Sequence, residues 1–354
     1  MSAAGPPAGA RPPGGAEHAG AGNEPASGAR NPAASGAPAR GKRLPGTPEP
    51  MHVWAGAGGV PIAADAWGDP RGPLILLQHG GGQTRHAWKG AGELLAAAGY
   101  YAVAFDARGH GDSGWSPDGR YDQDIMVEDL LCVIAALGHR RPALVGASMG
   151  GGTGLVAAGE ERVDATALVL VDIAPRIEPE GVAKIREFMA QSPEGFDSLQ
   201  AVADAIANYQ PHRTRPRSLD GLAKNVRVGD DGRYRWHWDP AFRRGPQFDF
   251  RKRQLRLEAC ARNLKLPVLL VRGGMSDVLT DEGVREFQAL CPQVEYVNIT
   301  GAAHMVAGDR NDIFGNAVID FLARAVPADG SVPQHARPLQ AHHEGPPGAV
   351  DDIP

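Results

Sequence analysis

Residues 143–158 read ALVGASMGGGTGLVAA: a short apolar run, a serine between glycines, and then a helix-forming stretch. Residues 146–150 fit the pattern G-x-S-x-G, which occurs often by chance and gains meaning only from the strand before it and the helix after it. The turn between strand and helix must be so sharp that Ser148 adopts a strained backbone, and side chains at positions 146 and 150 would collide with it. Such a turn lifts the hydroxyl of Ser148 clear of the sheet, beside the N–H groups that begin the helix. The stretch therefore predicts a nucleophilic serine at the edge of a sheet.

Short apolar runs and helical patterns alternate on both sides of this stretch. The predicted strands are 74–78, 100–105, 143–145, 167–171, 268–271 and 294–299. The predicted helices are 93–98, 124–137, 149–158, 281–290 and 313–325. Strands without polar alternation, separated by helices, indicate a parallel sheet covered on both faces. We therefore predict a doubly wound α/β fold, with residues 52–54 and 60–67 as an antiparallel hairpin at its edge.

One long interval interrupts this alternation. Residues 175–263 contain helical stretches near 180–190 and 198–209, a Gly/Asp turn at 229–232, and then Tyr-Arg-Trp-His-Trp at 234–238. An insertion of this size between two core strands predicts a helical cap, or lid. The predicted core is accordingly 51–174 together with 264–325.

The two ends of the chain have a different composition. Ala, Gly and Pro occupy 33 of the first 50 positions, and residues 326–354 are similar in character. Such segments bury too little apolar surface to offset their ordering entropy, so we predict that 1–50 and 326–354 are disordered tails. Glycine and prolines at positions 5–7 interrupt any apolar segment of a secretory signal.

Composition narrows the class of protein. The chain of 354 residues is 42% hydrophobic and 22% charged, and its formal net charge is −5, which argues against a nucleic-acid partner. No apolar run approaches the roughly 20 residues of a membrane helix. Three cysteines without a CxxC favour a reducing, cytoplasmic location over a disulfide scaffold. We find no metal-ligand spacing and no dinucleotide fingerprint, so we predict no metal, no cofactor and a small-molecule substrate.

A nucleophilic serine needs a base and a group that orients the base. His304 follows the strand 294–299 directly, and Asp277 lies in the Gly-rich loop after the strand 268–271. The chain order Ser148, Asp277, His304 is the one expected for a triad on this architecture. Asp172, which ends the strand 167–171, is the alternative acid. We favour Asp277 because its Gly-rich loop can approach the histidine.

The glycines of His-Gly-Gly-Gly at 79–82 follow the first core strand. Glycines at this place allow backbone N–H groups to face a developing oxyanion, and we assign the donors as the amides of Gly81 and Met149.

Aromatic residues near these loops are candidates for the substrate pocket. They are His86 and Trp88 after the glycine loop, and Trp236 and Trp238 in the predicted cap, where packing within the cap is an equal alternative. A basic stretch is either a solvated helix face or a region that attracts an anionic substrate. Its members are Arg243, Arg244, Arg251, Lys252, Arg253 and Arg256.

Four motifs in this order resemble the α/β-hydrolase superfamily, specifically its lidded serine hydrolases. They are HGGG at 79–82, DARGHGDS at 106–113, GASMGG at 146–151 and GAAH at 301–304, and the resemblance covers residues 51–325. It is strongest to esterases and cofactor-free haloperoxidases or perhydrolases. In this family the DARGHGDS run is mainly a structural turn, in which we expect Arg108 and Asp112 to form an ion pair. Ser148 stands where epoxide hydrolases and haloalkane dehalogenases have an aspartate.

The sequence therefore predicts a serine hydrolase of a carboxylic ester or related acyl compound, acting through an acyl-enzyme. Two alternatives stay open. One is perhydrolase (haloperoxidase-like) or C–C bond hydrolase chemistry on the same triad. The other is a non-enzymatic ligand-binding protein built on a hydrolase scaffold.

Overall fold

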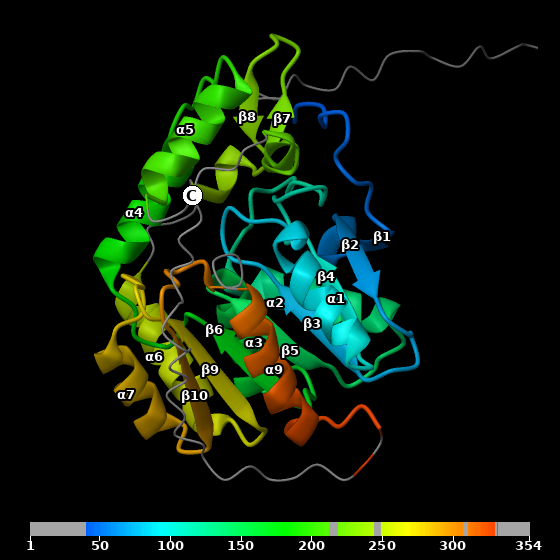
Figure 1. Ribbon diagram of the computed structural model, residues 1–354, viewed down its shortest axis with the longest axis vertical. Helices are drawn as coiled ribbons and strands as arrows, with labels where there is room; N and C mark the ends of the chain where they lie inside the picture. Colours follow the sequence, from blue (N-terminus) through cyan, green and yellow to red (C-terminus); the bar gives the residue numbers. More distant parts are fainter. Residues whose placement is uncertain (1–39, 212–218, 244–248, 307–310, 330, 332–354) are drawn as a thin grey trace, which may run out of the picture. The chain divides into compact units, whose positions relative to one another are not determined.

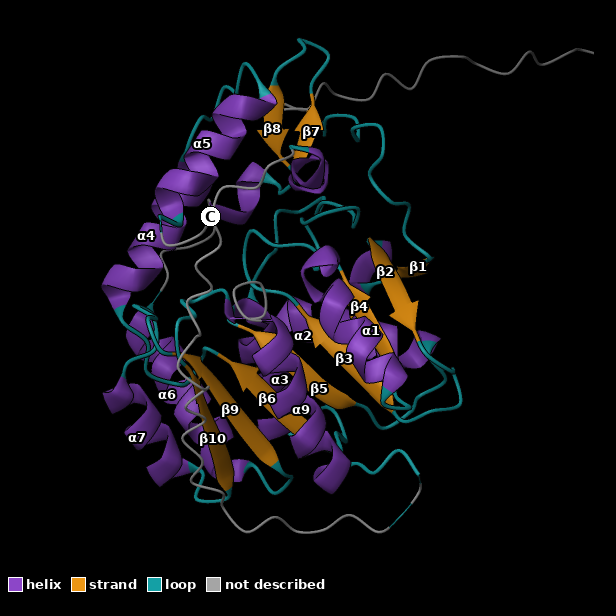
Figure 2. Ribbon diagram, in the orientation of Figure 1, coloured by secondary structure: helices purple, strands orange, loops and turns teal. Residues whose placement is uncertain are grey.

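The protein is described by a computed structural model that covers residues 40–211, 219–243, 249–306, 311–329 and 331. An eight-stranded sheet runs through it in the order β1-β2-β4-β3-β5-β6-β9-β10. Figure 1 follows the chain through this sheet, and Figure 2 shows helices on both of its faces. The expectation of disordered tails at 1–50 and 326–354 falls mostly on residues 1–39, 330 and 332–354, which lie outside the described residues. Val326 and Ala328, which we also expected to be disordered, pack against the apolar cluster that contains α9.

The strands from β4 to β10 pair in parallel, whereas β1 and β2 pair antiparallel with each other and β2 pairs antiparallel with β4. The sheet therefore has the predicted doubly wound core and the predicted edge hairpin. Its strands are β1 (His52–Ala55), β2 (Pro61–Trp67), β3 (Leu74–Gln78), β4 (Tyr101–Phe105), β5 (Ala143–Ala147), β6 (Ala167–Val171), β9 (Val268–Gly273) and β10 (Val294–Ile299).

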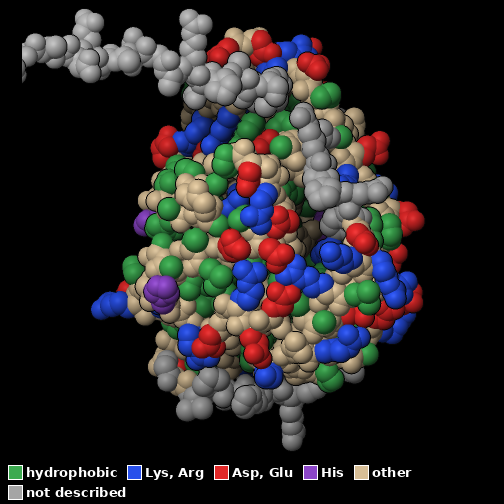
Figure 3. Space-filling model, turned by 180° about the vertical axis from the view of Figure 1, so that it is seen from behind, with side chains coloured by type: hydrophobic (Ala, Val, Ile, Leu, Met, Phe, Trp, Pro, Cys, Tyr) green, Lys and Arg blue, Asp and Glu red, His purple; other side chains and the backbone are tan. Residues whose placement is uncertain are grey.

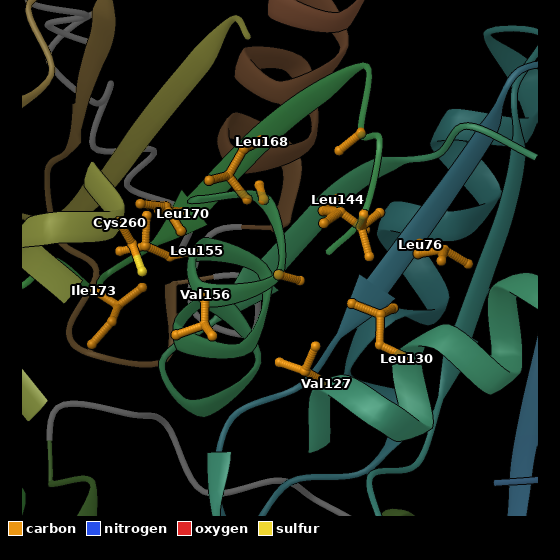
Figure 4. Packing of buried hydrophobic residues seen from close by; sticks show 14 of the residues in the cluster. Leu76, Val127, Leu130, Leu144, Leu155, Val156, Leu168, Leu170, Ile173 and Cys260 are labelled. Carbon is orange, nitrogen blue, oxygen red and sulfur yellow. The ribbon is translucent and has the colours of Figure 1, made fainter. Parts of the chain in front are cut away.

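Alternate side chains of the central strands pack into two hydrophobic clusters, one on each face of the sheet. One face is covered by α2 (Gln123–Ala136), α3 (Met149–Gly159), α6 (Phe250–Asn263) and α7 (Asp281–Leu290). The other face is covered by α1 (Lys89–Ala97) and α9 (Asn311–Ala325). Figure 4 shows the first cluster, where Leu155 and Val156 of α3 meet Leu168 and Leu170 of β6. The central strands consist mostly of apolar residues because both faces of the sheet are buried.

The cap is a separate layer with its own apolar cluster. It contains α4 (Pro179–Ala190), α5 (Leu199–Tyr209), the hairpin β7 (Val226–Val228) and β8 (Tyr234–Trp236), and two short 3-10 helices, Asp220–Asn225 and Pro240–Arg243. The predicted cap of 175–263 includes α6, but α6 packs on α3 and contributes Leu257 and Cys260 to the core cluster. The cap proper therefore ends before α6.

Residues 40–50 belong to the folded part of the chain, although we expected them to be disordered. Lys42 forms an antiparallel bridge with Val228, with backbone N···O distances of 2.7 and 2.8 Å. The side chain of Arg43 contacts Asp112 of the core, with 3.2 Å between Nε and Oδ1. A segment poor in large apolar residues is thus fixed by backbone pairing and charge.

A buried charge network lies beneath the 106–113 loop. The fully buried guanidinium of Arg85 contacts the carboxylates of Asp106 at 2.7 Å and Asp112 at 2.9 Å. The expected Arg108–Asp112 ion pair does not form. Arg108 instead pairs with Asp129 of α2 at 2.6 Å, and Asp112 also pairs with Arg227 of the cap at 2.8 Å. The loop turns these two side chains in different directions, one toward α2 and one toward the cap.

The molecular surface carries charges of both signs. On the face seen in Figure 3, Lys and Arg side chains are interspersed with Asp and Glu. Among the described helices, none has both the length and the apolar character that crossing a bilayer demands.

Candidate active site

Ser148 sits at the turn between β5 and α3 with φ 46° and ψ −107°. A positive φ at a residue other than glycine costs on the order of 1–3 kcal/mol and persists only where the surrounding structure enforces it. The enforcement is visible on both sides: the Ser148 N–H donates to Val171 C=O at 3.1 Å, and its C=O accepts the Gly152 N–H at 2.9 Å. Ser148 therefore has the strained backbone that the sequence predicts.

The glycines around Ser148 are required by close packing. A Cβ on Gly146 would lie 2.5 Å from backbone atoms of Gly150 and Gly151, and one on Gly150 would lie 2.5 Å from the carbonyl oxygen of Gln78. Real Cβ atoms do not approach that closely. This packing agrees with the prediction that side chains at 146 and 150 would collide with the turn at Ser148.

His304 follows β10 and is held by a carboxylate. Its Nδ1 lies 2.6 Å from Oδ2 of Asp172, which follows β6. Asp172 is fully buried, and its carboxylate also accepts the Gly273 N–H at 2.9 Å and the hydroxyl of Ser276. This environment holds Asp172 as a fixed acceptor, and its bond to Nδ1 places the proton of a neutral His304 on that nitrogen, leaving Nε2 free to accept one.

Asp277, the acid that the sequence analysis favoured, is not the partner of His304. Its carboxylate lies 2.7 Å from Nζ of Lys184 in the cap, and its side chain is half exposed. The Gly-rich loop after β9 does approach the histidine region, as expected. It does so, however, to present Gly273 and Ser276 to Asp172, and this turns Asp277 outward. The alternative acid, Asp172, is the residue that the structure brings to His304.

The glycine loop at 79–82 lies beside Ser148, since a Cβ on Gly80 would be 3.4 Å from Cβ of Ser148. The Gly80 N–H donates to Oε1 of Gln83 at 2.8 Å, and the Gly82 N–H donates to Nε2 of His110 at 3.2 Å. Within the described part of the chain, these bonds leave the Gly81 N–H as the one amide of 80–82 without an acceptor. Met149 begins α3, so its N–H also lies at a helix N-terminus.

Two predicted pocket residues lie elsewhere. Trp88 is 1% exposed and packs in the core against Phe314 of α9, with ring centroids 5.9 Å apart. The ring of His86 points to Asp65, with Nδ1 3.7 Å from Oδ2, and burial, followed by the charge of Arg85, lowers its pKa. The 3-10 helix Arg85–Trp88 thus places Trp88 in the core and His86 beside Asp65, contacts that the sequence did not predict.

The cap does cover the glycine loop with apolar side chains. A Cβ on Gly82 would lie 3.5 Å from Met189 and from Trp238, and one on Gly81 would lie 4.0 Å from Met189 and Phe242. Trp236 stacks on Trp238 with centroids 4.9 Å apart, inside the apolar cluster of the cap. Trp238 is thus both cap core and a neighbour of the loop, while Trp236 belongs to the cap core.

The basic stretch divides into separate environments. Arg256 pairs with Asp124 at 2.6 Å and with Glu160 at 2.7 Å, and Arg251 and Lys252 are exposed. Arg253 turns inward, with Nη2 3.3 Å from the place of a Cβ on Gly152, and burial lowers its pKa to about 10. Arg244 and the side chain of Arg243 lie outside the described residues. The four described side chains of the stretch therefore do not share one surface.

Two further residues contribute to this region that the sequence did not predict, His110 and His237. Both are fully buried and contact Gly82. His110 stands in the DARGHGDS run, where we assigned only a structural turn, and no pattern in the cap sequence distinguishes His237. The apolar run Leu-Val-Leu-Val before Asp172 was the available signal for the acid, since it places Asp172 at the carboxyl end of a buried strand.

This fold and these strand-end residues define a class of enzyme, and comparison with known proteins identifies it. Residues 73–310 match the family of the alpha/beta hydrolase fold. The chain belongs to this family and is an α/β-hydrolase enzyme.

Individual relatives agree with this assignment. The chain is 32% identical over 269 residues to Esterase Rv0045c of Mycobacterium tuberculosis, covering 74% of this chain and 85% of the relative. It is 28% identical over 255 residues to the 3-hydroxybutyrate-oligomer hydrolase of Cupriavidus necator, covering 69% and 86%. The crystal structure of Esterase Rv0045c matches with a TM-score of 0.60 at 29% identity, over 78% of this chain and 92% of that one.

Proposed function

We propose that this enzyme is a serine hydrolase that cleaves a carboxylic ester of a small molecule through an acyl-enzyme intermediate. The observation that carries the proposal is the contact of 2.6 Å between Nδ1 of His304 and the buried carboxylate of Asp172. It occurs at the sheet edge where β5 ends in the strained Ser148. Strained backbone, oriented base and buried acid together are the parts that activate a serine hydroxyl.

In the first half of the reaction, Oγ of Ser148 attacks the ester carbonyl carbon while Nε2 of His304 accepts the hydroxyl proton. Asp172 holds the imidazole by Nδ1–H and stabilises the imidazolium that forms. The N–H groups of Gly81 and Met149 stabilise the oxyanion of the tetrahedral intermediate. His304 then returns the proton to the departing alkoxide, which leaves as the alcohol.

In the second half, water attacks the acyl-enzyme and His304 accepts its proton. A second tetrahedral intermediate forms on the same two N–H donors. It collapses as His304 returns the proton to Ser148, and the carboxylic acid leaves. These steps use only side chains, backbone amides and water, so the proposed reaction requires neither a metal nor a cofactor.

The side chains of the cap favour a substrate ester with an apolar group next to the carbonyl. Met189, Trp238 and Phe242 are the cap side chains that lie nearest to Gly81 and Gly82. Apolar surface of this kind favours a hydrocarbon acyl or alcohol group over a charged one.

The names of the relatives, an esterase and a 3-hydroxybutyrate-oligomer hydrolase, fit an ester substrate. We also propose a reducing location, because Cys132, Cys260 and Cys291 are all free thiols.

The test uses p-nitrophenyl acetate and butyrate with the full chain, followed by labelling with a fluorophosphonate. We expect turnover, and one label per chain, in the unchanged protein. Ser148→Ala should lose the labelling and about 10⁶-fold in kcat, the scale seen when a catalytic serine is removed. Ser331→Ala, a change at an exposed serine after α9, is the matched control and should behave like the unchanged protein.

Two outcomes would contradict the proposal. Turnover that survives Ser148→Ala would place the chemistry on another residue. A tightly bound ligand that is never turned over, with Ser148 unlabelled, would favour the ligand-binding alternative. Labelling without turnover of either ester would direct the search to bulkier esters, to peroxide-dependent chemistry and to C–C substrates.

A further inference from the structure

Three buried histidines surround the glycine loop 79–82. His79 begins the loop, His110 lies in the core loop after β4, and His237 follows β8 in the cap. Their exposed fractions are 1%, 0% and 0%. Burial lowers the pKa of His79 to about 4, that of His110 to about 3, and that of His237 well below its ordinary value. Near pH 7 each ring is therefore neutral, with one N–H donor and one bare nitrogen acceptor.

His79 fixes the peptide between Gly80 and Gly81. Its Nε2 accepts the Ala107 N–H at 2.9 Å, so its proton is on Nδ1 and is donated to the Gly80 C=O at 2.8 Å. The carbonyl of one residue and the N–H of the next lie in one trans peptide plane and point in opposite directions. Holding the carbonyl of Gly80 on one side therefore directs the Gly81 N–H to the other.

His110 and His237 fix Gly82 from two sides. Nε2 of His110 accepts the Gly82 N–H at 3.2 Å. Nδ1 of His237 accepts the Gly111 N–H at 2.8 Å, which places its proton on Nε2, 3.3 Å from the Gly82 carbonyl oxygen. Gly82 has φ +74°, a conformation that the two bonds hold and that only glycine adopts freely. Both polar backbone groups of Gly82 are thus bound by imidazoles, one from the core and one from the cap.

The Gly82 carbonyl shares a peptide plane with the Gln83 N–H, which donates to the Gly80 carbonyl at 3.1 Å. We propose that His237 is a positioning residue: from the cap, it holds the Gly82–Gln83 peptide, which in turn holds the Gly80 carbonyl and so keeps the Gly81 N–H directed at the oxyanion that forms on Ser148. The inference rests on the proposed function, because it concerns the oxyanion donor of that reaction. Its consequence is that the oxyanion site is completed by the cap, so the cap contributes to the rate and not only to the choice of substrate.

The geometry offers a sharp pair of variants. In His237→Asn, the amide oxygen replaces Nδ1 as acceptor for Gly111, and the donor to Gly82 is lost. In His237→Gln, the longer side chain returns an N–H donor to the place of Nε2. His86→Asn is the matched control, since it removes a partly buried histidine whose ring lies near Asp65.

We would measure kcat and KM for p-nitrophenyl butyrate, normalised to sites titrated with the fluorophosphonate so that unfolded protein does not count. Removing a whole oxyanion donor costs about 10²–10³-fold in kcat, so a misdirected donor should cost about 10- to 100-fold. We expect this loss in His237→Asn with KM within about twofold, partial recovery in His237→Gln, and no loss in His86→Asn. A trifluoromethyl ketone, which forms an oxyanion on the serine, should lose affinity in parallel with kcat, while the carboxylate product should not.

Three results would overturn the inference. Unchanged kcat in His237→Asn would remove the need for the Gly82 contact. A rise in KM at constant kcat would make His237 a residue of substrate binding or cap packing. An equal loss of kcat in the Asn and Gln variants, with the affinity for the trifluoromethyl ketone unchanged in both, would exclude the donor to Gly82 as the cause. Absence of turnover in the unchanged protein would instead refute the proposed function, so the two failures are distinguishable.

Discussion

The loops after β6 and β9 each bring an aspartate to the same edge of the sheet, yet the two carboxylates have opposite surroundings. Asp172, after β6, is fully buried and accepts from the Gly273 N–H, the Ser276 hydroxyl and His304. Asp277, after β9, has a half-exposed side chain that pairs with Lys184. A buried carboxylate with several donors cannot rotate away from its partner, whereas an exposed one exchanges its partner with water.

The comparison shows how one loop can serve the aspartate of another. Gly273 is the last residue of β9, and Ser276 lies in the loop that carries Asp277; both donate to Asp172. The β9 loop therefore contributes donors to the site instead of the acid. An orienting carboxylate has to be oriented itself, and only the strand end at Asp172 provides that.

The largest effect expected from this contrast is that of Asp172→Asn. An asparagine cannot hold the imidazole in the required tautomer or stabilise the imidazolium, so kcat should fall on the order of 10⁴-fold. Asp277→Asn is the matched control and should leave kcat within about twofold of the unchanged protein. Ester turnover by both variants, with circular dichroism to verify their folding, decides between the two aspartates. A large loss in Asp277→Asn, with Asp172→Asn active, would reverse the assignment.

The second effect concerns the contact between the β9 loop and the segment that carries His304. A Cβ on Gly273 would lie 2.2 Å from the carbonyl oxygen of Ala303, so Gly273→Ala must displace the residue before His304. A shift of about 1 Å in a catalytic group is enough to cost about 10²-fold in rate. We expect that loss in kcat for p-nitrophenyl butyrate.

The neighbouring glycine provides the control for this prediction. In Gly274→Ala, the new Cβ would have its closest contact at 3.3 Å, to the Ile299 carbonyl oxygen, which requires a movement of only a few tenths of an ångström. The loss of kcat in this variant should stay below about tenfold. Equal losses in the two variants would mean that the loop is generally sensitive, with no special role for the Ala303 contact.

The sequence predicted the elements of the core well, because its strands are short apolar runs that both faces of the sheet bury. The predicted strands 74–78, 167–171 and 294–299 have the bounds of β3, β6 and β10. Ser148 could be predicted for a related reason: the steric demand for glycine at 146 and 150 is local and can be read from five consecutive residues.

The acid could not be chosen in this way, because its choice depends on contacts between distant segments. Asp172 and Asp277 both follow strands of the same sheet. The neighbouring sequence does not show which carboxylate accepts the hydrogen bonds of Gly273 and Ser276. Trp88 and His86 were misplaced for the same reason, since one 3-10 turn decides whether a ring faces the loop or the core. Cap residues such as His237 are least predictable, because their partners lie more than 100 residues away in the chain.

A smaller effect is expected from Ser276→Ala. The hydroxyl of Ser276 donates to the carboxylate of Asp172, whose other oxygen keeps the Gly273 N–H. Losing one of these donors to a charged group should reduce kcat by about 10-fold and leave KM unchanged, because Asp172 loses one restraint and retains the others. Comparing Ser276→Ala and Asp172→Asn with the double variant Ser276→Ala/Asp172→Asn measures their coupling: an additive loss would show that Ser276 acts independently of Asp172.

The smallest effect is expected at the exposed pair of Asp277 and Lys184. The hydrogen bond to Asp277, and then its charge, raise the pKa of Lys184 above its ordinary value of 10.5. A raised pKa in the folded protein means that the pair stabilises the fold at pH values below 10.5 and that this contribution disappears as the pH rises through the raised pKa. Lys184→Met should therefore leave kcat unchanged and lower the thermal midpoint slightly at pH 8. That difference should shrink both at higher pH and at high salt, because exposed charges are screened. A large loss of activity in Lys184→Met would mean that Asp277 acts in catalysis through its partner, and the contrast between the two loops would fail.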